Sequence, residues 1–268
     1  MLPQEELIAR VRELCQADEK LVAALTYGSF PQGQADAHSD IEFWLFFRTD
    51  PGDGIDRRAW LGRIAPNRYA VMNEFGTYVV FFPDLIRGEF HFATAGDIAS
   101  VATWPSRGAP VDRMIVLDRT GELRRVLESL PDRPPVPSSV KEIEGLCGRF
   151  ANWLVLAHHV SQRGELLRAI DALSHAQRHL LWIVRIAEGQ TAHWLTPSRQ
   201  AEVDLDREVV AALHATAAPA EAGAIGEAIA AAWECGRRCW LTLADRVGVP
   251  VPRELFGEID VAIGRREP

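Results

Sequence analysis

The sequence predicts an α+β chain in which a mixed sheet with flanking helices is followed by an all-α helical bundle. Three observations indicate this class. Short apolar runs alternate with helical stretches in the first half, a proline-rich segment follows, and long runs with helical periodicity fill the second half. We therefore expect two domains, at 1–130 and 140–268, joined by a linker at 131–139.

The first half contains most of the apolar runs that are typical of strands. Leu7, Val11 and Leu14 fall on one face of an expected N-terminal helix. The turn-rich stretch 49–54 separates two strand candidates, and a short helix should follow Gly121. The expected strands are 21–29, 40–47, the runs RYAVMNEF and TYVVFFPD on either side of Gly76, 85–92 and 114–120.

The linker and the helices after it have clear end signals. Four prolines fall within residues 131–137, and proline fixes φ and removes a backbone donor, so this segment is a stiff connection. Gly164 and Gly189 follow periodic runs, as expected at helix C-termini. The expected helices are 142–164, 165–189, 205–216, 220–247 and 253–264.

Composition argues against nucleic-acid-binding, membrane-spanning and secreted proteins. The formal net charge is -8 and the pI is about 5.5, which argues against a nucleic-acid polymer as the main partner. No run approaches the roughly 18 apolar residues of a membrane span, and the N-terminus has no signal-peptide pattern. The four cysteines form no C-x-x-C pair and are expected to be core thiols. A cytoplasmic protein is the expectation.

Two strand candidates place acidic side chains at alternate positions. Asp40 and Glu42 share one face of the first, because successive side chains of a strand point to opposite faces. Arg87, Glu89 and His91 share one face of the second by the same rule. The two strands would form one acidic site if they are neighbours and these faces coincide.

Such carboxylates repel one another unless a cation neutralises them, and Mg²⁺ prefers carboxylates together with water and substrate phosphates. Gly28 ends the preceding strand candidate, and a glycine lets the backbone approach a ligand closely. The Ser29 hydroxyl and the amides after it are suited to bind a phosphate oxygen. The combination predicts a site for a metal ion and a triphosphate.

The pattern Gly28-Ser29, ten residues, Asp40-Ile41-Glu42 resembles the nucleotidyltransferase fold shared with DNA polymerase β. The spacing of Gly33 and Ser39 is also typical of that superfamily. Over most of residues 1–195 the chain resembles the lincosamide nucleotidyltransferases, through YGSF, SDIEF, NEFGT, LIRGEFHF and IVRIAE. The resemblance implies that the sheet domain has the nucleotidyltransferase fold.

The resemblance also implies a role for individual residues. Asp40 and Glu42 match the metal-binding pair, and Gly28 and Ser29 match the residues that grip the triphosphate. Glu89 matches a third carboxylate at the metal, the proposed general base on the acceptor hydroxyl. Family members transfer AMP from ATP to a hydroxyl of lincomycin or clindamycin, which implies ATP, Mg²⁺ and a small antibiotic as ligands, antibiotic resistance as the outcome and a homodimer as the assembly.

Each of these residues also has a purely structural interpretation. Asp40 and Glu42 would then be a solvated strand end, and Ser29 a turn cap. Glu89 would pair with Arg87, whose alternative partner is a phosphate. These alternatives stay open from the sequence alone.

Histidines and tryptophans elsewhere are interpreted as structural or pocket-lining. His91 is expected to be a hydrogen-bonded strand residue, and His38 to be exposed. In the helical half, no histidine has a partner carboxylate at metal spacing, and the aromatic residues follow helical spacing. This set comprises His158, His159, His175, His179, His193, Trp153, Trp182, Trp194, Trp233 and Trp240.

Two other functions remain as alternatives. The same fold could modify an aminoglycoside, a polycation that an acidic pocket would favour. A different class is an antitoxin or interaction protein, for which the helical half should carry an R-x4-H motif. The pairs Arg168 with His175 and Arg149 with His158 have the wrong spacing for that motif.

Overall fold

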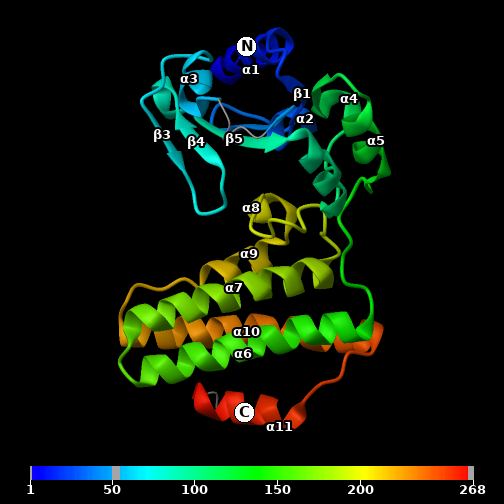
Figure 1. Cartoon of the computed structure of the whole chain (residues 1–268). Helices are drawn as coiled ribbons and strands as arrows, with labels where there is room; N and C mark the ends of the chain where they lie inside the picture. The colour runs from blue at the N-terminus through cyan, green and yellow to red at the C-terminus, as the bar shows by residue number, and fades with distance from the viewer. Residues whose placement is uncertain (1, 50–54, 265–268) are drawn as a thin grey trace. The chain divides into compact units, whose positions relative to one another are not determined.

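The computed structural model describes residues 2–49 and 55–264, so the turn expected at 49–54 lies outside them except for Thr49. The chain divides into two compact units, Met1–Pro135 and Val136–Pro268 (Figure 1). All described strands belong to the first unit, and the second is built from helices. This confirms the α+β class.

The first unit is organised around one six-stranded sheet with the order β3-β4-β5-β2-β1-β6. Neighbouring strands pair antiparallel except β2 and β5, which are parallel, so the sheet is mixed as expected. The strands are β1 (Leu21–Thr26), β2 (Ile41–Phe47), β3 (Tyr69–Met72), β4 (Tyr78–Phe81), β5 (Arg87–Thr94) and β6 (Ile115–Asp118).

Helices cover both faces of this sheet. On one face, Ile41 and Phe43 of β2 share a buried cluster with residues of α1 and α3. On the other, Phe46 of β2 shares a second cluster with residues of η2, α4 and α5. Burial of both faces explains why the strands are so apolar. The helices are α1 (Pro3–Ala17), α3 (Arg57–Gly62), η2 (Ala95–Thr103), α4 (Val111–Met114) and α5 (Glu122–Ser129).

Several strand ends differ from the expected boundaries, and two of the differences lie near the acidic residues. The strand expected at 21–29 ends at Thr26, because a one-turn helix, α2 (Ser29–Gln32), begins at Ser29. The strand expected at 85–92 starts at Arg87, after the short 3-10 helix η1 (Pro83–Leu85). Both shifts occur where the chain turns next to the acidic residues.

The second unit is dominated by three long helices, α6, α7 and α10, which pack around one apolar core. Phe150 of α6 stacks on Trp233 of α10, with ring centroids 6.4 Å apart. A Cβ on Gly236 would lie 2.3 Å from Phe150, so α10 needs glycine there to approach α6. No described helix is long and apolar enough to cross a bilayer. The helices are α6 (Val140–Gln162), α7 (Leu166–Glu188), α8 (Ala201–Asp204), α9 (Arg207–His214), α10 (Ala222–Val247) and α11 (Arg253–Ala262).

The chain between α7 and α8 has little regular structure and is held by one buried side chain. Arg185 is fully buried and donates to the backbone carbonyls of Gln190, Pro197 and Arg199 at 2.6–2.8 Å. Its Nη1 also donates to Asp204 at 3.0 Å. Because a guanidinium has five N–H donors in a planar fork, one arginine can fix several turns of this segment.

Candidate active site

The acidic residues lie at one end of the two central parallel strands. In the register of β2 and β5, Glu42 pairs with Glu89, and Ile41 pairs with Gly88. Asp40 immediately precedes β2, so Asp40, Glu42 and Glu89 occupy the same face of adjacent strands. Adjacent strands are about 4.8 Å apart, which brings the three carboxylates into one group. The condition set by the sequence, neighbouring strands with coincident faces, is met.

Gly28 lies in the turn between β1 and α2, and its backbone contacts this acidic group. Its φ of +76° with ψ of -150° is a backbone conformation that essentially only glycine adopts. A Cβ at this position would lie 1.5 Å from Oε2 of Glu42, so the absence of a side chain is what lets the carboxylate approach. Ser29 follows directly as the first residue of α2. The structure thus brings the Gly-Ser turn and the acidic pair together.

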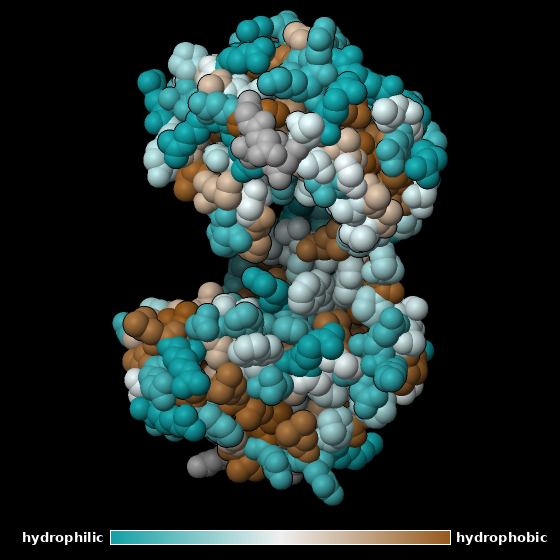
Figure 2. Space-filling view, in the orientation of Figure 1, coloured by the Kyte–Doolittle hydropathy of each residue, from teal (hydrophilic) through white to brown (hydrophobic). Residues whose placement is uncertain are grey.

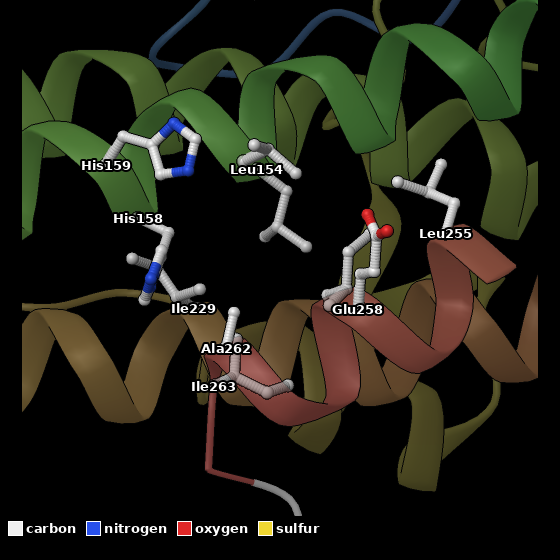
Figure 3. Close-up of a pocket in the computed structure, with 10 residues that line it drawn as sticks. Leu154, His158, His159, Ile229, Leu255, Glu258, Ala262 and Ile263 are labelled. Atoms are coloured by element: carbon white, nitrogen blue, oxygen red, sulfur yellow. The ribbon is translucent and has the colours of Figure 1, made fainter.

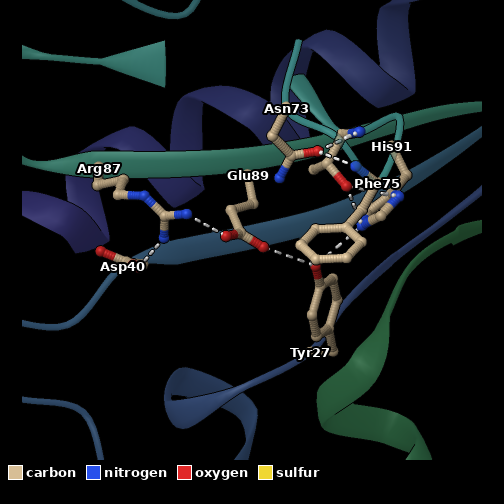
Figure 4. A network of polar contacts seen from close by, with 8 residues as sticks. Tyr27, Asp40, Asn73, Phe75, Arg87, Glu89 and His91 are labelled. Atoms are coloured by element: carbon tan, nitrogen blue, oxygen red, sulfur yellow. Dashed lines mark hydrogen bonds and ion pairs between the residues drawn. The ribbon is translucent and has the colours of Figure 1, made fainter. Parts of the chain in front are cut away.

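Arg87 is the cation of the site. Its Nη1 donates to Oδ2 of Asp40 and its Nη2 to Oε1 of Glu89, so one guanidinium bridges two carboxylates (Figure 4). Burial acts to lower the pKa of Arg87, but the hydrogen bonds and charges of Glu89 and Asp40 outweigh it and hold the pKa above its ordinary value. The ion pair that the sequence left open is therefore present.

The second oxygen of Glu89 faces a neutral donor, Tyr27. The Tyr27 hydroxyl donates to Oε2 of Glu89 at 3.4 Å and lies 3.2 Å from Nε2 of His91 (Figure 4). Burial, followed by the negative charges of Glu42 and Glu89, raises the pKa of Tyr27 above its ordinary value. The phenol keeps its proton at neutral pH, and Glu89 is held from both sides.

His91 continues this network toward the β3–β4 hairpin. Its ring lies 3.2 Å from the Thr77 hydroxyl and stacks on Trp44, with centroids 4.1 Å apart. Burial lowers the pKa of His91 against the opposing effect of Glu89. Asn73 accepts hydrogen bonds from the backbone amides of Phe75 and Thr77, which fixes the turn that carries Thr77. The NEFGT motif therefore has a structural role, and His91 is a hydrogen-bonded strand residue as expected.

Tyr27 is the site residue that sequence reasoning missed. The sequence contained a signal for it, because Tyr27 directly precedes Gly28 and lies two residues after Leu25, on the same face of the first expected strand. Its backbone amide donates to the Glu42 carbonyl at 3.2 Å, which extends the pairing of β1 with β2. His38 is exposed, as expected, and takes no part in the network.

The three carboxylates on this face are hard oxygen donors, the ligand type that Mg²⁺ prefers. The residue types of Asp40, Glu42 and Glu89, and their place on adjacent strands, thus fit a magnesium ion in chemistry. In residues 2–49 and 55–264, no group of three or more His, Cys, Asp and Glu side chains is arranged to hold a metal ion directly. The Arg87 guanidinium bridges two of the three carboxylates instead.

Histidines of the helical unit differ in their surroundings. His193 has a carboxylate partner that the sequence analysis did not predict, since its Nδ1 lies 2.8 Å from Oδ2 of Asp204. His158 and His159 line a cavity of about 260 Å³ with Glu258, among apolar residues of α6, α10 and α11 (Figure 3). Apolar surface gathers on this side of the unit, where α6 lies beside α11 (Figure 2).

The sequence of residues 139–260 matches the family model described as lincosamide nucleotidyltransferase-like, C-terminal domain. No curated protein matches the chain. Among solved structures, an aminoglycoside 6-adenyltransferase from Bacillus subtilis is similar at 12% identity, with a TM-score of 0.46 and coverage of 97% of this chain and 96% of that one.

Two further solved structures are similar at lower scores. A nucleotidyltransferase-like protein from Exiguobacterium sibiricum is 12% identical, with a TM-score of 0.38 over 97% of this chain and 88% of that one. A CCA-adding enzyme in complex with CTP is 11% identical, with a TM-score of 0.30 over 98% and 73%. Residues 139–260, which match the lincosamide nucleotidyltransferase-like C-terminal domain, follow the mixed sheet that carries the acidic site described above.

Proposed function

We propose that this protein is a nucleotidyltransferase, which transfers AMP from ATP to a hydroxyl of a lincosamide antibiotic and so inactivates it. The main support is the register of β2 and β5, in which Glu89 pairs with Glu42 beside the Gly-Ser turn. The family match over residues 139–260 supports a lincosamide as the acceptor. Asp40, Glu42 and Glu89 would hold Mg²⁺, and Gly28 and Ser29 would contact the triphosphate.

Magnesium bound there would neutralise the phosphate oxygens and the departing pyrophosphate. The acceptor hydroxyl oxygen forms a bond to the α-phosphorus of ATP. The bond from that phosphorus to the oxygen bridging the β-phosphorus breaks, and its electron pair leaves with pyrophosphate. Glu89 takes the hydroxyl proton. The Tyr27 hydroxyl, which retains its own proton, orients the Glu89 carboxylate for that transfer.

Mass spectrometry after incubation with ATP and Mg²⁺ tests the proposal, with clindamycin and kanamycin as separate acceptors. Gain of one AMP on clindamycin alone is the expected result. An AMP adduct on kanamycin alone would replace the lincosamide with an aminoglycoside acceptor. The absence of any adduct would contradict the proposed activity.

The role of Glu89 has its own test. Glu89→Gln keeps the shape of the side chain and one acceptor oxygen, but it replaces the other oxygen with an NH₂ donor and cannot take up the proton. Turnover should therefore fall by ~10²–10⁴-fold while the fold is kept. The matched control is Glu13→Gln, which changes an exposed carboxylate paired with Arg10. Its turnover should equal that of the unchanged protein. Equal rates for both variants would remove Glu89 from the mechanism.

We also propose that the protein acts in the cytoplasm as a homodimer. The resemblance to lincosamide nucleotidyltransferases supports this assembly, in which the helical unit would help to shape the antibiotic pocket. Sedimentation at several protein concentrations measures the oligomeric state. A monomer at all concentrations would contradict this part of the proposal.

A further inference from the structure

Arg87 forms ion pairs with two of the three carboxylates that are proposed to bind the metal ion. Its two terminal nitrogens donate to Asp40 and Glu89, one to each. Glu42 lies opposite Glu89 in the strand register, so the same small area holds three carboxylates and one guanidinium. A guanidinium carries one positive charge, and Arg87 shares it between the carboxylates of Asp40 and Glu89. A metal ion at Asp40 and Glu89 would therefore compete with Arg87 for the same oxygens.

The backbone that carries Arg87 is fixed on both sides. Arg87 pairs with Phe81 of β4, and the next residue, Gly88, pairs with Ile41 of β2. The Arg87 side chain, in contrast, is 35% exposed and contacts the acidic group through its terminal nitrogens. A change at this position can therefore be confined to side-chain rotation, without movement of the sheet.

Phosphate is the other natural partner of a guanidinium, because the planar fork of an arginine matches two phosphate oxygens. A metal ion and Arg87 cannot both make full use of the oxygens of Asp40 and Glu89. We propose that Arg87 is an exchangeable counter-ion, which neutralises Asp40 and Glu89 in the resting site and passes to the triphosphate when the metal ion and nucleotide bind. This inference rests on the proposed function.

The exchange predicts two effects of opposite sign for one substitution. Without the guanidinium, Asp40 and Glu89 are free to bind a metal ion in the absence of nucleotide, so affinity for the metal alone should rise. The triphosphate loses a charged donor at the same time, so nucleotide affinity should fall. A purely structural ion pair predicts no gain in metal affinity, because its loss would only loosen the site.

The experiment uses the full chain with Arg87→Met, Arg87→Gln and Arg87→Lys. Electron paramagnetic resonance of Mn²⁺ measures binding of the metal alone. Calorimetry with Mg²⁺ and an ATP analogue carrying a methylene bridge between the α and β phosphates measures nucleotide binding. Arg10→Met is the matched control, since Arg10 is an exposed arginine paired with Glu13. Circular dichroism confirms that each variant is folded.

We expect Arg87→Met and Arg87→Gln to bind Mn²⁺ alone at least ~10-fold more tightly and the analogue at least ~10-fold more weakly, the size of one charged hydrogen bond. Arg87→Lys keeps the positive charge next to Asp40 and Glu89, so its affinity for Mn²⁺ alone should stay low. It lacks the planar fork of arginine, so it should bind the analogue more weakly. Unchanged or weaker Mn²⁺ binding in either neutral variant, if folded, overturns the inference and leaves the proposed function standing. Failure of the unchanged protein to bind the analogue overturns the proposed function itself.

Discussion

Two arginines of this chain bind carboxylates in opposite ways. Arg185, in the helical unit, is fully buried, and three of its four acceptors are backbone carbonyl oxygens. Arg87, in the sheet unit, is 35% exposed and bridges the side chains Asp40 and Glu89. Backbone acceptors can leave only if the chain unfolds locally, whereas side-chain acceptors can exchange one cation for another. Arg185 therefore fixes the backbone of the helical unit, whereas Arg87 holds two side chains of the candidate site.

The largest expected effect is on stability and follows from substitution of Arg185, the buried arginine. Arg185→Met leaves Asp204 and three carbonyls without their buried donor, which should lower the free energy of unfolding by ~3–5 kcal/mol. Urea denaturation measures the loss. The matched control is Arg168→Met, because Arg168 is exposed and paired with Glu165, a contact worth ~0–1 kcal/mol. Similar losses for the two variants would show that the buried network does not hold the α7–α8 segment.

The next largest effect is on the rate of AMP transfer and follows from substitution of Gly28, next to the acidic group that Arg87 bridges. Gly28→Ala places a Cβ against the Glu42 carboxylate in a backbone conformation that disfavours side chains, so the acidic group must shift. Misplacement by about 1 Å can cost ~10²-fold in rate, and we expect a loss of that size in kcat/KM for AMP transfer. Gly121→Ala is the control, since Gly121 also has a positive φ but open space around it. A loss of rate in the control as large as in Gly28→Ala would assign the effect to backbone strain alone.

The sequence was sufficient to predict the α+β class and the face that carries the acids, because both follow from local periodicity. Alternation along 40–47 and 85–92 placed Asp40, Glu42 and Glu89 on common faces, and the structure has them so. The pairing of β2 with β5 was not predictable in the same way. Parallel neighbours are joined by a long crossover, here through residues 48–86, and no local pattern records which strands meet.

The partners of the two arginines were harder to predict. Arg87 and Glu89 share a face at spacing i, i+2, but the bridge to Asp40 depends on the neighbouring strand. Arg185 lies within an apolar helical run, and three of its acceptors are backbone oxygens of an irregular segment. Every residue carries such an oxygen, so the sequence contains no pattern that identifies these acceptors. The contact of His193 with the side chain of Asp204 was also missed, because the chain between them has little regular structure and no periodicity relates the two residues.

The smallest effect concerns the one carboxylate in the Arg185 network. Asp204 accepts hydrogen bonds from His193 at 2.8 Å and from Arg185 at 3.0 Å. Burial acts to raise the pKa of Asp204, but these two partners together hold that pKa below its usual range. A depressed pKa in the folded state means that Asp204 stabilises the fold above the ordinary Asp pKa of ~3.9, and that this contribution is lost as the pH falls through the folded value.

Many other carboxylates titrate in the same range, so the measurement must be a difference in unfolding free energy between the unchanged protein and Asp204→Asn. We expect this difference to be constant from pH 7 to about 5 and to shrink as the pH falls toward 3. The same difference for Asp171→Asn, at an exposed position of α7, should stay close to zero throughout. A difference for Asp204→Asn that does not change with pH would mean that the Arg185 network depends on its carbonyl acceptors alone, and that the carboxylate adds no charge-dependent stability to it.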